Sequence, residues 1–349
     1  MFINEIKHSM QRRCSNWDYS NPSIYMITMC LANRSIPLLG DITIEPCIQG
    51  NISPFNVKAK MSYSPIGEAI MKIWKEISSI NPSVKPLIIQ IMPEHLHCIL
   101  HVMSKMTKPL GQIIASFKGR CSKAYWELTP EMDGIPLFVK GYQDTILFHK
   151  GQLDRMIRYV LDNPRRLAIK RLYPNLFQEQ RLIPFAGGFY SGIGNHFLLD
   201  YPILRQVQVS RSEYGTEAFE KKKADFLYNL QYGTALVSPC INKGERDIAY
   251  SALEKNVPLI ILKHNGFNRF FKPSGFLFDA CAMGRILMLA PSAWGYTEGK
   301  PIITREKSCV LNSLAQMICG ENSSNIIYKG YVPPNLNQLI AEALTPPNF

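Results

Sequence analysis

Short apolar runs alternate with helix-like segments in the first half of the chain. Runs typical of β-strands lie at residues 24–31, 41–48, 85–92 and 96–102. Apolar residues recur at helical spacing at residues 67–80, 110–128 and 153–163, and Pro164 is expected to end the last of these helices. This order predicts an antiparallel sheet with helices packed on it.

The second half follows a different pattern. Proline and glycine interrupt the periodicity near residues 180–200. Continuous apolar strands at 204–209, 235–238, 259–262 and 286–289 then alternate with helices at 217–230, 245–254, 278–283 and 305–318. Such alternation predicts a parallel α/β sheet of the Rossmann type. We therefore predict two domains, 1–183 and 184–349, in this chain of 349 residues.

Two histidines one residue apart, His95 and His97, stand at the start of the run 96–102. Alternate side chains of a strand share a face, so the two imidazoles are expected to lie side by side. They can then be two ligands of a divalent metal ion. They can equally be ordinary half-buried polar residues. Glu94 points elsewhere by the same alternation, and we expect it to be structural or to face DNA.

Tyr159 and Asn163 are four residues apart in the helix before Pro164. They therefore share a helix face, which we expect to lie off the apolar stripe. The pair can offer a phenol nucleophile and, next to it, an amide oxygen as a third metal ligand.

These residues carry a family resemblance. Met92-Pro93-Glu94-His95-Leu96-His97 resembles the HUH motif (histidine, hydrophobic, histidine) of single-tyrosine HUH transposases, and the run 159–164 resembles the tyrosine helix of REP-associated tyrosine transposases. Ser-Phe-Lys-Gly-Arg at 116–120 and Gly-Tyr-Gln-Asp at 141–144 are similar to that family in the same order. The match covers about the first half of the chain.

The resemblance implies a ferredoxin-like HUH fold for this half, giving an α+β domain followed by the α/β domain. It also implies Mg²⁺ or Mn²⁺ on His95, His97 and Asn163, with Tyr159 as the catalytic residue. The implied reaction cuts and rejoins single-stranded DNA near hairpins through a 5′-phosphotyrosine link. Asp144, in a family-like segment, is a candidate to steady the site by supporting its metal ligands. Relatives occur as monomers and as dimers, so a homodimer stays open.

The charge distribution favours a polyanionic partner. Net charge is +12; residues 1–183 hold 23 Lys and Arg against 14 Asp and Glu, and the remainder holds 16 against 13. In the helix 110–128, Lys118, Arg120 and Lys123 accompany aromatic residues, as in proteins that bind single strands, although a solvated charged face is an equal alternative. A second basic group surrounds Tyr159, which favours phosphate binding there: Arg155, Arg158, Arg165 and Arg166.

Nine scattered cysteines without a C-x-x-C pair indicate reduced thiols, and no run reaches membrane-spanning length, so we expect a cytoplasmic protein that does not enter a membrane. Three functions stay open. The first is an active transposase or nickase. The second is a domesticated DNA-binding protein without turnover, and the third is a nucleotide-handling enzyme centred on the α/β half.

The α/β half loosely resembles the Rossmann-like domain of DNA-processing protein A. The resemblance lies in residues 237–245, which open a helix after a strand, and in Lys272-Pro273-Ser274-Gly275 before another helix. The glycines do not form G-x-G-x-x-G, so a dinucleotide site is not supported. The N-terminus of the helix 245–254 is a candidate phosphate site, but the domain could equally serve only to bind partners or position DNA.

Overall fold

The computed structural model of the chain describes residues 14, 16–45, 57–299, 301–320 and 332–346. Its internal contacts divide the chain between Ala168 and Ile169 into an N-terminal and a C-terminal unit. The division lies inside a helix, upstream of the boundary that the sequence suggested at 183/184. The segment rich in proline and glycine is a β-hairpin of the C-terminal unit, not a linker.

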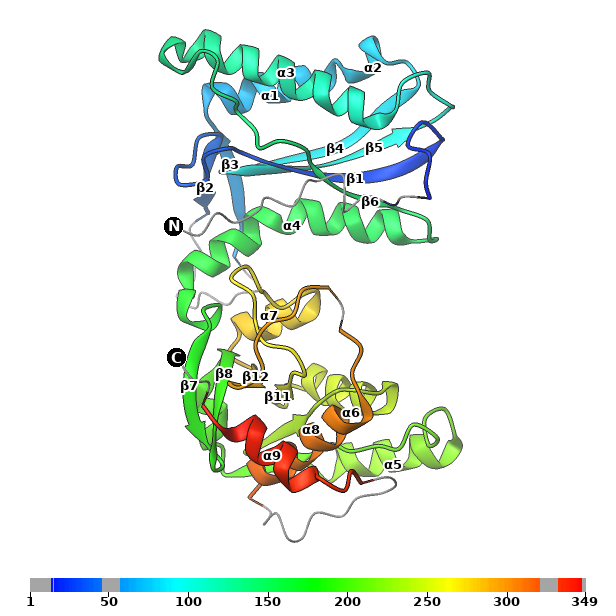
Figure 1. Cartoon of the computed structure of the whole chain (residues 1–349), viewed down its shortest axis with the longest axis vertical. Helices are drawn as coiled ribbons and strands as arrows, with labels where there is room; N and C mark the ends of the chain where they lie inside the picture. Colours follow the sequence, from blue (N-terminus) through cyan, green and yellow to red (C-terminus); the bar gives the residue numbers. More distant parts are fainter. Residues whose placement is uncertain (1–13, 15, 46–56, 300, 321–331, 347–349) are drawn as a thin grey trace. The chain divides into compact units, whose positions relative to one another are not determined.

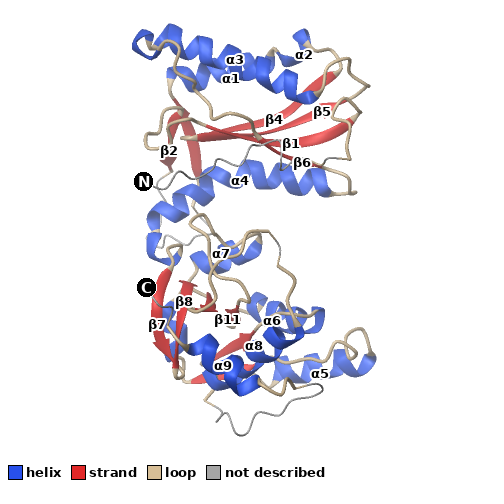
Figure 2. Cartoon of the chain, in the orientation of Figure 1, coloured by secondary structure: helices blue, strands red, loops and turns tan. Residues whose placement is uncertain are grey.

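The N-terminal unit contains an antiparallel sheet with helices (Figures 1 and 2). Its strands are β1 (Ser23–Cys30), β2 (Gly40–Ile44), β3 (Ala59–Tyr63), β4 (Val84–Met92), β5 (His95–Val102) and β6 (Gln143–Ile146). Its helices are α1 (Pro65–Lys75), α2 (Ile77–Ile80), α3 (Leu110–Leu128) and α4 (Gln152–Leu172), with a 3₁₀ turn at Pro130–Met132. The antiparallel sheet and the helices at 110–128 and around Tyr159 agree with the prediction.

The main sheet of this unit has the order β4-β5-β1-β6, and every pairing in it is antiparallel. Helices α1 and α3 cover one face and α4 covers the other (Figure 1). Alternate side chains of the two central strands build a large apolar core under α1 and α3: Tyr25, Ile27, Met29, Leu96, Cys98 and Leu100. The other alternate set faces α4, and that set includes both histidines.

Local sequence explains where α1 begins. Ser64 caps the helix by accepting the Gly67 N–H at 3.2 Å, and Pro65 occupies the first turn. The predicted segment 67–80 divides into α1 and α2 around Glu76. The strand predicted at 41–48 is β2, which ends at Ile44 and pairs with β3 in a separate ribbon; residues 46–48 lie outside the described residues.

Helix α4 continues through Pro164 to Leu172, so the expectation that this proline ends the helix is wrong. A proline within a helix removes the N–H that would reach the carbonyl four residues earlier, here that of Val160. The Asn163 amide replaces it: Nδ2 donates to the Val160 carbonyl at 3.2 Å and to the Tyr159 carbonyl at 2.9 Å. The side chain next to the proline therefore satisfies the backbone group that the proline leaves open.

The C-terminal unit contains a mixed sheet and its own helices (Figure 2). Its strands are β7 (Gln180–Phe185), β8 (Gly188–Gly194), β9 (Ile203–Gln206), β10 (Thr234–Ser238), β11 (Leu259–Leu262) and β12 (Ile286–Pro291). Its helices are α5 (Glu217–Tyr228), α6 (Lys243–Glu254), α7 (Phe276–Ala282), α8 (Arg305–Ile318) and α9 (Leu336–Leu344), with 3₁₀ turns at Pro174–Leu176 and His196–Asp200.

The sheet of the C-terminal unit has the order β7-β8-β12-β11-β10-β9. Strands β9 to β12 pair in parallel, as the sequence predicts, but β8 pairs antiparallel with β12 and extends the sheet through the β7–β8 hairpin. Because the sheet is mixed, the Rossmann type itself stays a prediction. Alternate strand residues pack against α8 and α9: Val237, Ile260, Leu262, Leu287 and Leu289.

Two whole-chain expectations can be compared with the described residues. Within them, no helix is both long and apolar enough to cross a membrane. No disulfide joins the cysteines of the same residues, and Cys47 lies outside them.

Candidate active site

The two histidines lie at the start of β5, directly after the Pro93-Glu94 turn. Their ring centroids are 4.8 Å apart, with an angle of 79° between the ring planes. The strand therefore brings both imidazoles to the α4 face of the sheet, as alternation predicts. His97 is 7% exposed, so one of the two is buried in the fold.

A residue that the sequence did not single out orients His97. Thr28 of β1 is its cross-strand partner, and Thr28 Oγ1 lies 2.8 Å from His97 Nδ1. If Nδ1 carries the proton and donates to the hydroxyl, Nε2 keeps a lone pair for a ligand. Only the pairing of β1 with β5, which are far apart in sequence, reveals this contact.

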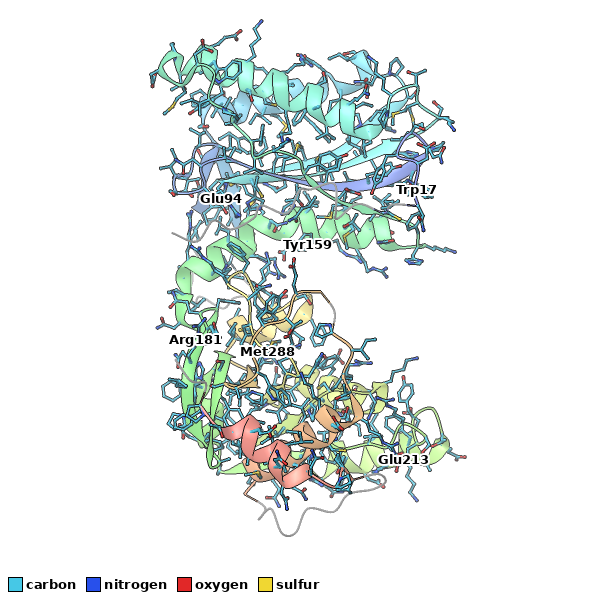
Figure 3. All side chains as sticks on the ribbon, viewed as in Figure 1. Trp17, Glu94, Tyr159, Arg181, Glu213 and Met288 are labelled. Atoms are coloured by element: carbon cyan, nitrogen blue, oxygen red, sulfur yellow. The ribbon has the colours of Figure 1, made fainter. Side chains whose placement is uncertain are left out.

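His95 has an acidic neighbour in Glu94, which Figure 3 labels at the turn between β4 and β5. Glu94 Oε1 lies 3.4 Å from His95 Nδ1 and 3.4 Å from Arg34 Nη2. The imidazole of His95, and to a lesser extent the charge of Arg34, lowers the pKa of Glu94 against the opposite effect of burial. The carboxylate of Glu94 therefore lies next to His95. Alternation of side chains along the strand had predicted that Glu94 points elsewhere.

Helix α4, on which Figure 3 labels Tyr159, brings the ring of this residue next to His97. The Tyr159 ring centroid is 5.8 Å from that of His97, with the planes at 62°. The ring packs beside a small apolar cluster of Met26, Ile99 and Val160. Tyr159 thus faces the sheet, which corrects the expectation that its face lies off the apolar stripe; Leu161, assigned to that stripe, is 56% exposed.

Asn163 lies one turn beyond Tyr159 and is 5% exposed. Its Nδ2 donates hydrogen bonds to the carbonyls of Tyr159 and Val160, and these bonds fix the orientation of the amide. Its Oδ1 accepts no hydrogen bond from any described residue, so this oxygen remains an acceptor for a ligand.

The donor set fits a divalent cation of the predicted kind. The described residues contain no group of three or more His, Cys, Asp or Glu side chains able to hold a metal, so a third ligand has to be of another type. The amide oxygen of Asn163, one helical turn beyond Tyr159, is the candidate for this ligand. Two imidazoles with an oxygen ligand suit Mn²⁺ and are compatible with Mg²⁺.

The basic residues predicted on α3 lie on the opposite face of the sheet from the histidines. Lys118 Nζ donates to two backbone carbonyls in the loop before β6, at 2.6 and 2.9 Å, and burial lowers its pKa. Arg120 pairs with Glu76, and the exposed Lys123 lies 3.9 Å from Glu127. These intramolecular contacts explain Lys118 and Arg120 without DNA, and the predicted DNA-binding role of α3 stays a prediction.

The basic residues predicted on α4 share the helix of Tyr159. Arg165 forms two hydrogen bonds with Asp162, at 2.6 and 3.0 Å, and Arg166 is 6% exposed. Arg155 and Arg158 are exposed, and no ion pair with them occurs in the described ranges. These two guanidinium groups are therefore available to a phosphate.

Asp144 lies on the other face of the sheet. It pairs with Ile27, whose side chain belongs to the apolar core under α1 and α3, and it accepts a 2.8 Å hydrogen bond from the Tyr19 hydroxyl. Because cross-strand partners share a face, Asp144 cannot contact the imidazoles of His95 and His97 directly. Asp144 is therefore not placed to support His95 or His97 as a metal ligand, which is the role that the sequence had predicted.

Comparison with known proteins gives distant similarities. No family model matches the chain. An uncharacterized protein of Haemophilus influenzae (strain ATCC 51907 / DSM 11121 / KW20 / Rd) is 26% identical over 141 residues, which are 40% of this chain. The match spans 61% of the length of that relative.

Two solved structures are similar to 44% of the chain. One is a REP-associated tyrosine transposase bound to a REP hairpin, with 12% identity, a TM-score of 0.29 and 72% of that chain covered. The other is a candidate transposase from Deinococcus radiodurans R1, with 13% identity, a TM-score of 0.27 and 96% of that chain covered. These likenesses are distant both in sequence and in fold.

Proposed function

We propose that this chain cuts and rejoins single-stranded DNA, with Tyr159 as the nucleophile. The observation that carries the proposal is the 5.8 Å ring contact between Tyr159 and His97, with His95 at 4.8 Å from His97. A phenol and two imidazoles from two separate segments lie next to one another, and Asn163 is one helical turn beyond the phenol. These are the groups that phosphoryl transfer to a tyrosine would use.

In the proposed step, the Tyr159 oxygen attacks the phosphorus of a phosphodiester and loses its proton. The new bond joins tyrosine to the 5′ phosphate, and the bond from phosphorus to the 3′ oxygen breaks. The departing oxygen takes a proton and becomes a free 3′ hydroxyl. Attack of a 3′ hydroxyl on the phosphotyrosine reverses the step, so strands can be rejoined without another energy source.

The side chains of His95, His97 and Asn163 would hold a divalent cation, Mg²⁺ or Mn²⁺, which when bound supplies positive charge beside the scissile phosphate. Thr28 would orient the ring of His97 through its contact with Nδ1. The exposed Arg155 would bind flanking phosphates from the helix of the nucleophile. A strand with a hairpin beside a single-stranded flank is the substrate that we expect.

A cleavage assay with end-labelled DNA tests the proposal. The substrate is a hairpin with single-stranded flanks, labelled at the 5′ end in one reaction and at the 3′ end in another, with Mg²⁺ or Mn²⁺ present. We expect the 3′ label to migrate with the protein after denaturation, because the tyrosine keeps the 5′ phosphate of the downstream piece. The 5′ label should appear on a shorter strand that ends in a hydroxyl.

Tyr159→Phe should abolish the protein-linked product, whereas Tyr125→Phe should leave it unchanged. Tyr125 is a suitable control because it is buried in α3, on the other face of the sheet. A covalent product that persists in Tyr159→Phe contradicts the proposal. Specific binding of the hairpin without cutting, in the wild-type chain with either metal, would favour the DNA-binding protein without turnover.

A mixing experiment tests whether two copies of the chain share an active site. Tyr159→Phe lacks the nucleophile, and His97→Ala lacks one imidazole, so each variant alone should fail to cleave. Recovery of cleavage on mixing would mean that the tyrosine of one chain acts with the histidines of another. Without recovery, each chain uses its own tyrosine.

A further inference from the structure

A cavity of 240 Å³ lies at the carboxyl ends of β10 and β11 in the C-terminal unit. Ligands of open α/β sheets usually bind at the carboxyl ends of parallel strands. Its polar lining residues are Cys240, Arg246, Tyr250, Lys263 and His264, and its apolar wall includes Ile261, Leu277 and Met288, the last of which is labelled in Figure 3.

The N-terminus of α6, next to this cavity, is closed to an added anion. Glu245 Oε2 accepts the Ile241 N–H at 2.8 Å and lies 3.4 Å from the Asn242 nitrogen, while Asn242 Oδ1 accepts the Glu245 N–H at 2.9 Å. This capping box uses the backbone groups that would otherwise bind phosphate. The phosphate site predicted at the start of the helix is therefore occupied by the protein's own carboxylate.

Two cations line the cavity, and neither forms a salt bridge within the part of the chain that the structure describes. Lys263, the residue after β11, is partly buried, and burial lowers the pKa of its ammonium group. No ion pair or side-chain hydrogen bond of Lys263 occurs among the described residues. The second cation, Arg246, is held only by a 3.5 Å contact from Nη1 to the carbonyl of Cys240.

The cavity lining contains no group that would be anionic at neutral pH. No carboxylate is present among the described residues that line it. Burial raises the pKa of the Cys240 thiol to about 12 and that of the Tyr250 phenol to about 12, so both stay protonated. Lys263 is partly desolvated in this lining, and an anion bound beside it and the exposed Arg246 would offset that cost.

We propose that this cavity binds the phosphate group of a small phosphomonoester, with Lys263 and Arg246 as its charged ligands. The Tyr250 hydroxyl can add a hydrogen bond, and Leu277 and Met288 offer apolar contact to the organic part. At 240 Å³ the cavity is below the range of about 300–1,000 Å³ that is usual for larger ligands, which excludes a dinucleotide. The phosphomonoester can be a free nucleotide or the 5′ end of a DNA strand.

Isothermal titration calorimetry on the full chain tests the proposal with thymidine 5′-monophosphate and with thymidine. We expect saturable binding of the monophosphate and none of the nucleoside. Lys263→Met and Arg246→Gln should each weaken binding about ten- to a hundredfold, as the loss of a charged hydrogen bond does. Lys255→Met is the matched control, because Lys255 is exposed at the other end of α6 and should not affect binding.

The outcomes separate the two sources of the phosphate. A 5′-phosphorylated oligonucleotide that binds more tightly than both its unphosphorylated form and the mononucleotide identifies a DNA end; tighter binding of the mononucleotide identifies a free ligand. The proposal is overturned if neither the mononucleotide nor the 5′-phosphorylated oligonucleotide binds saturably. It is also overturned if wild type and Arg246→Gln bind these ligands with equal affinity. Arg246 is exposed, so this variant should fold even if Lys263→Met does not. Tyr159→Phe should bind normally, which makes the result independent of the cleavage assay.

Discussion

The two faces of the main sheet in the N-terminal unit carry different kinds of side chain. Under α1 and α3, the strands contribute fully buried side chains such as Ile27, Leu96 and Leu100 to one large apolar core. Under α4, the same strands contribute a small apolar cluster and then, toward one end, Thr28 and the two histidines. A single set of strands thus provides a packed face and a polar face.

The difference shows how stability and chemistry are separated in this unit. Burial of a large aliphatic side chain contributes about 1.5–3 kcal/mol, so the face under α1 and α3 carries most of the stabilisation. The polar groups under α4 each need a partner because they are partly or fully buried. The contact with Thr28 orients the His97 ring, and the two helix carbonyls orient the Asn163 amide.

The largest predicted effect is on the packed face. Leu100→Ala removes a fully buried side chain, and we expect the free energy of unfolding to fall by about 2–5 kcal/mol. Leu161→Ala, on the exposed side of α4, should change it by less than about 0.5 kcal/mol. Urea denaturation measures both. Equal losses for the two variants would contradict the assignment of the core to the face under α1 and α3.

Much of the fold was predictable because hydrophobic periodicity is a local signal. The helix at 110–128 was predicted with its observed bounds, and each parallel strand of the C-terminal unit was found near its predicted position. The short strands β3 and β6 were missed, since four or five residues give too little alternation. The end of α4 was misplaced because a side chain, Asn163, compensates for the helix-breaking proline.

The site was predictable in part for the same reason. His95 with His97, and Tyr159 with Asn163, are pairs within one element, and their spacing shows that they share a face. Contacts between elements leave no such signal. Thr28 meets His97 only because β1 pairs with β5, and Asp144 misses the site only because its register with β1 places it on the opposite face.

The next prediction concerns the hydrogen bond that orients His97. Thr28→Val keeps the shape of the side chain but removes the hydroxyl from His97 Nδ1. Loss of a residue that orients a metal ligand typically lowers metal affinity about ten- to a hundredfold, and we expect this for Mn²⁺. Calorimetric titration with Mn²⁺ measures the effect, and Thr28→Ser, which restores a hydroxyl, should recover most of the affinity.

A second readout separates orientation of the ring from general damage. Nitrogen-15 NMR of the metal-free protein reports which ring nitrogen of His97 carries the proton. Wild type and Thr28→Ser should hold the proton on Nδ1, and Thr28→Val should show a mixture of tautomers. The same tautomer in all three proteins would remove the proposed role of Thr28, whatever the metal affinities.

The smallest predicted effect tests how α4 continues past Pro164. Asn163→Ala leaves the Val160 carbonyl without a donor, which should destabilise the fold, since an unsatisfied buried polar group costs about 1–3 kcal/mol. In a Pro164→Ala background, residue 164 has an N–H that can reach that carbonyl, so the same substitution should cost about 1 kcal/mol less. Denaturation of the wild type, both single variants and the double variant gives this coupling energy. An equal cost in the two backgrounds would mean that the Asn163 amide does not replace the missing N–H, and the continuation of α4 past Pro164 would need another cause.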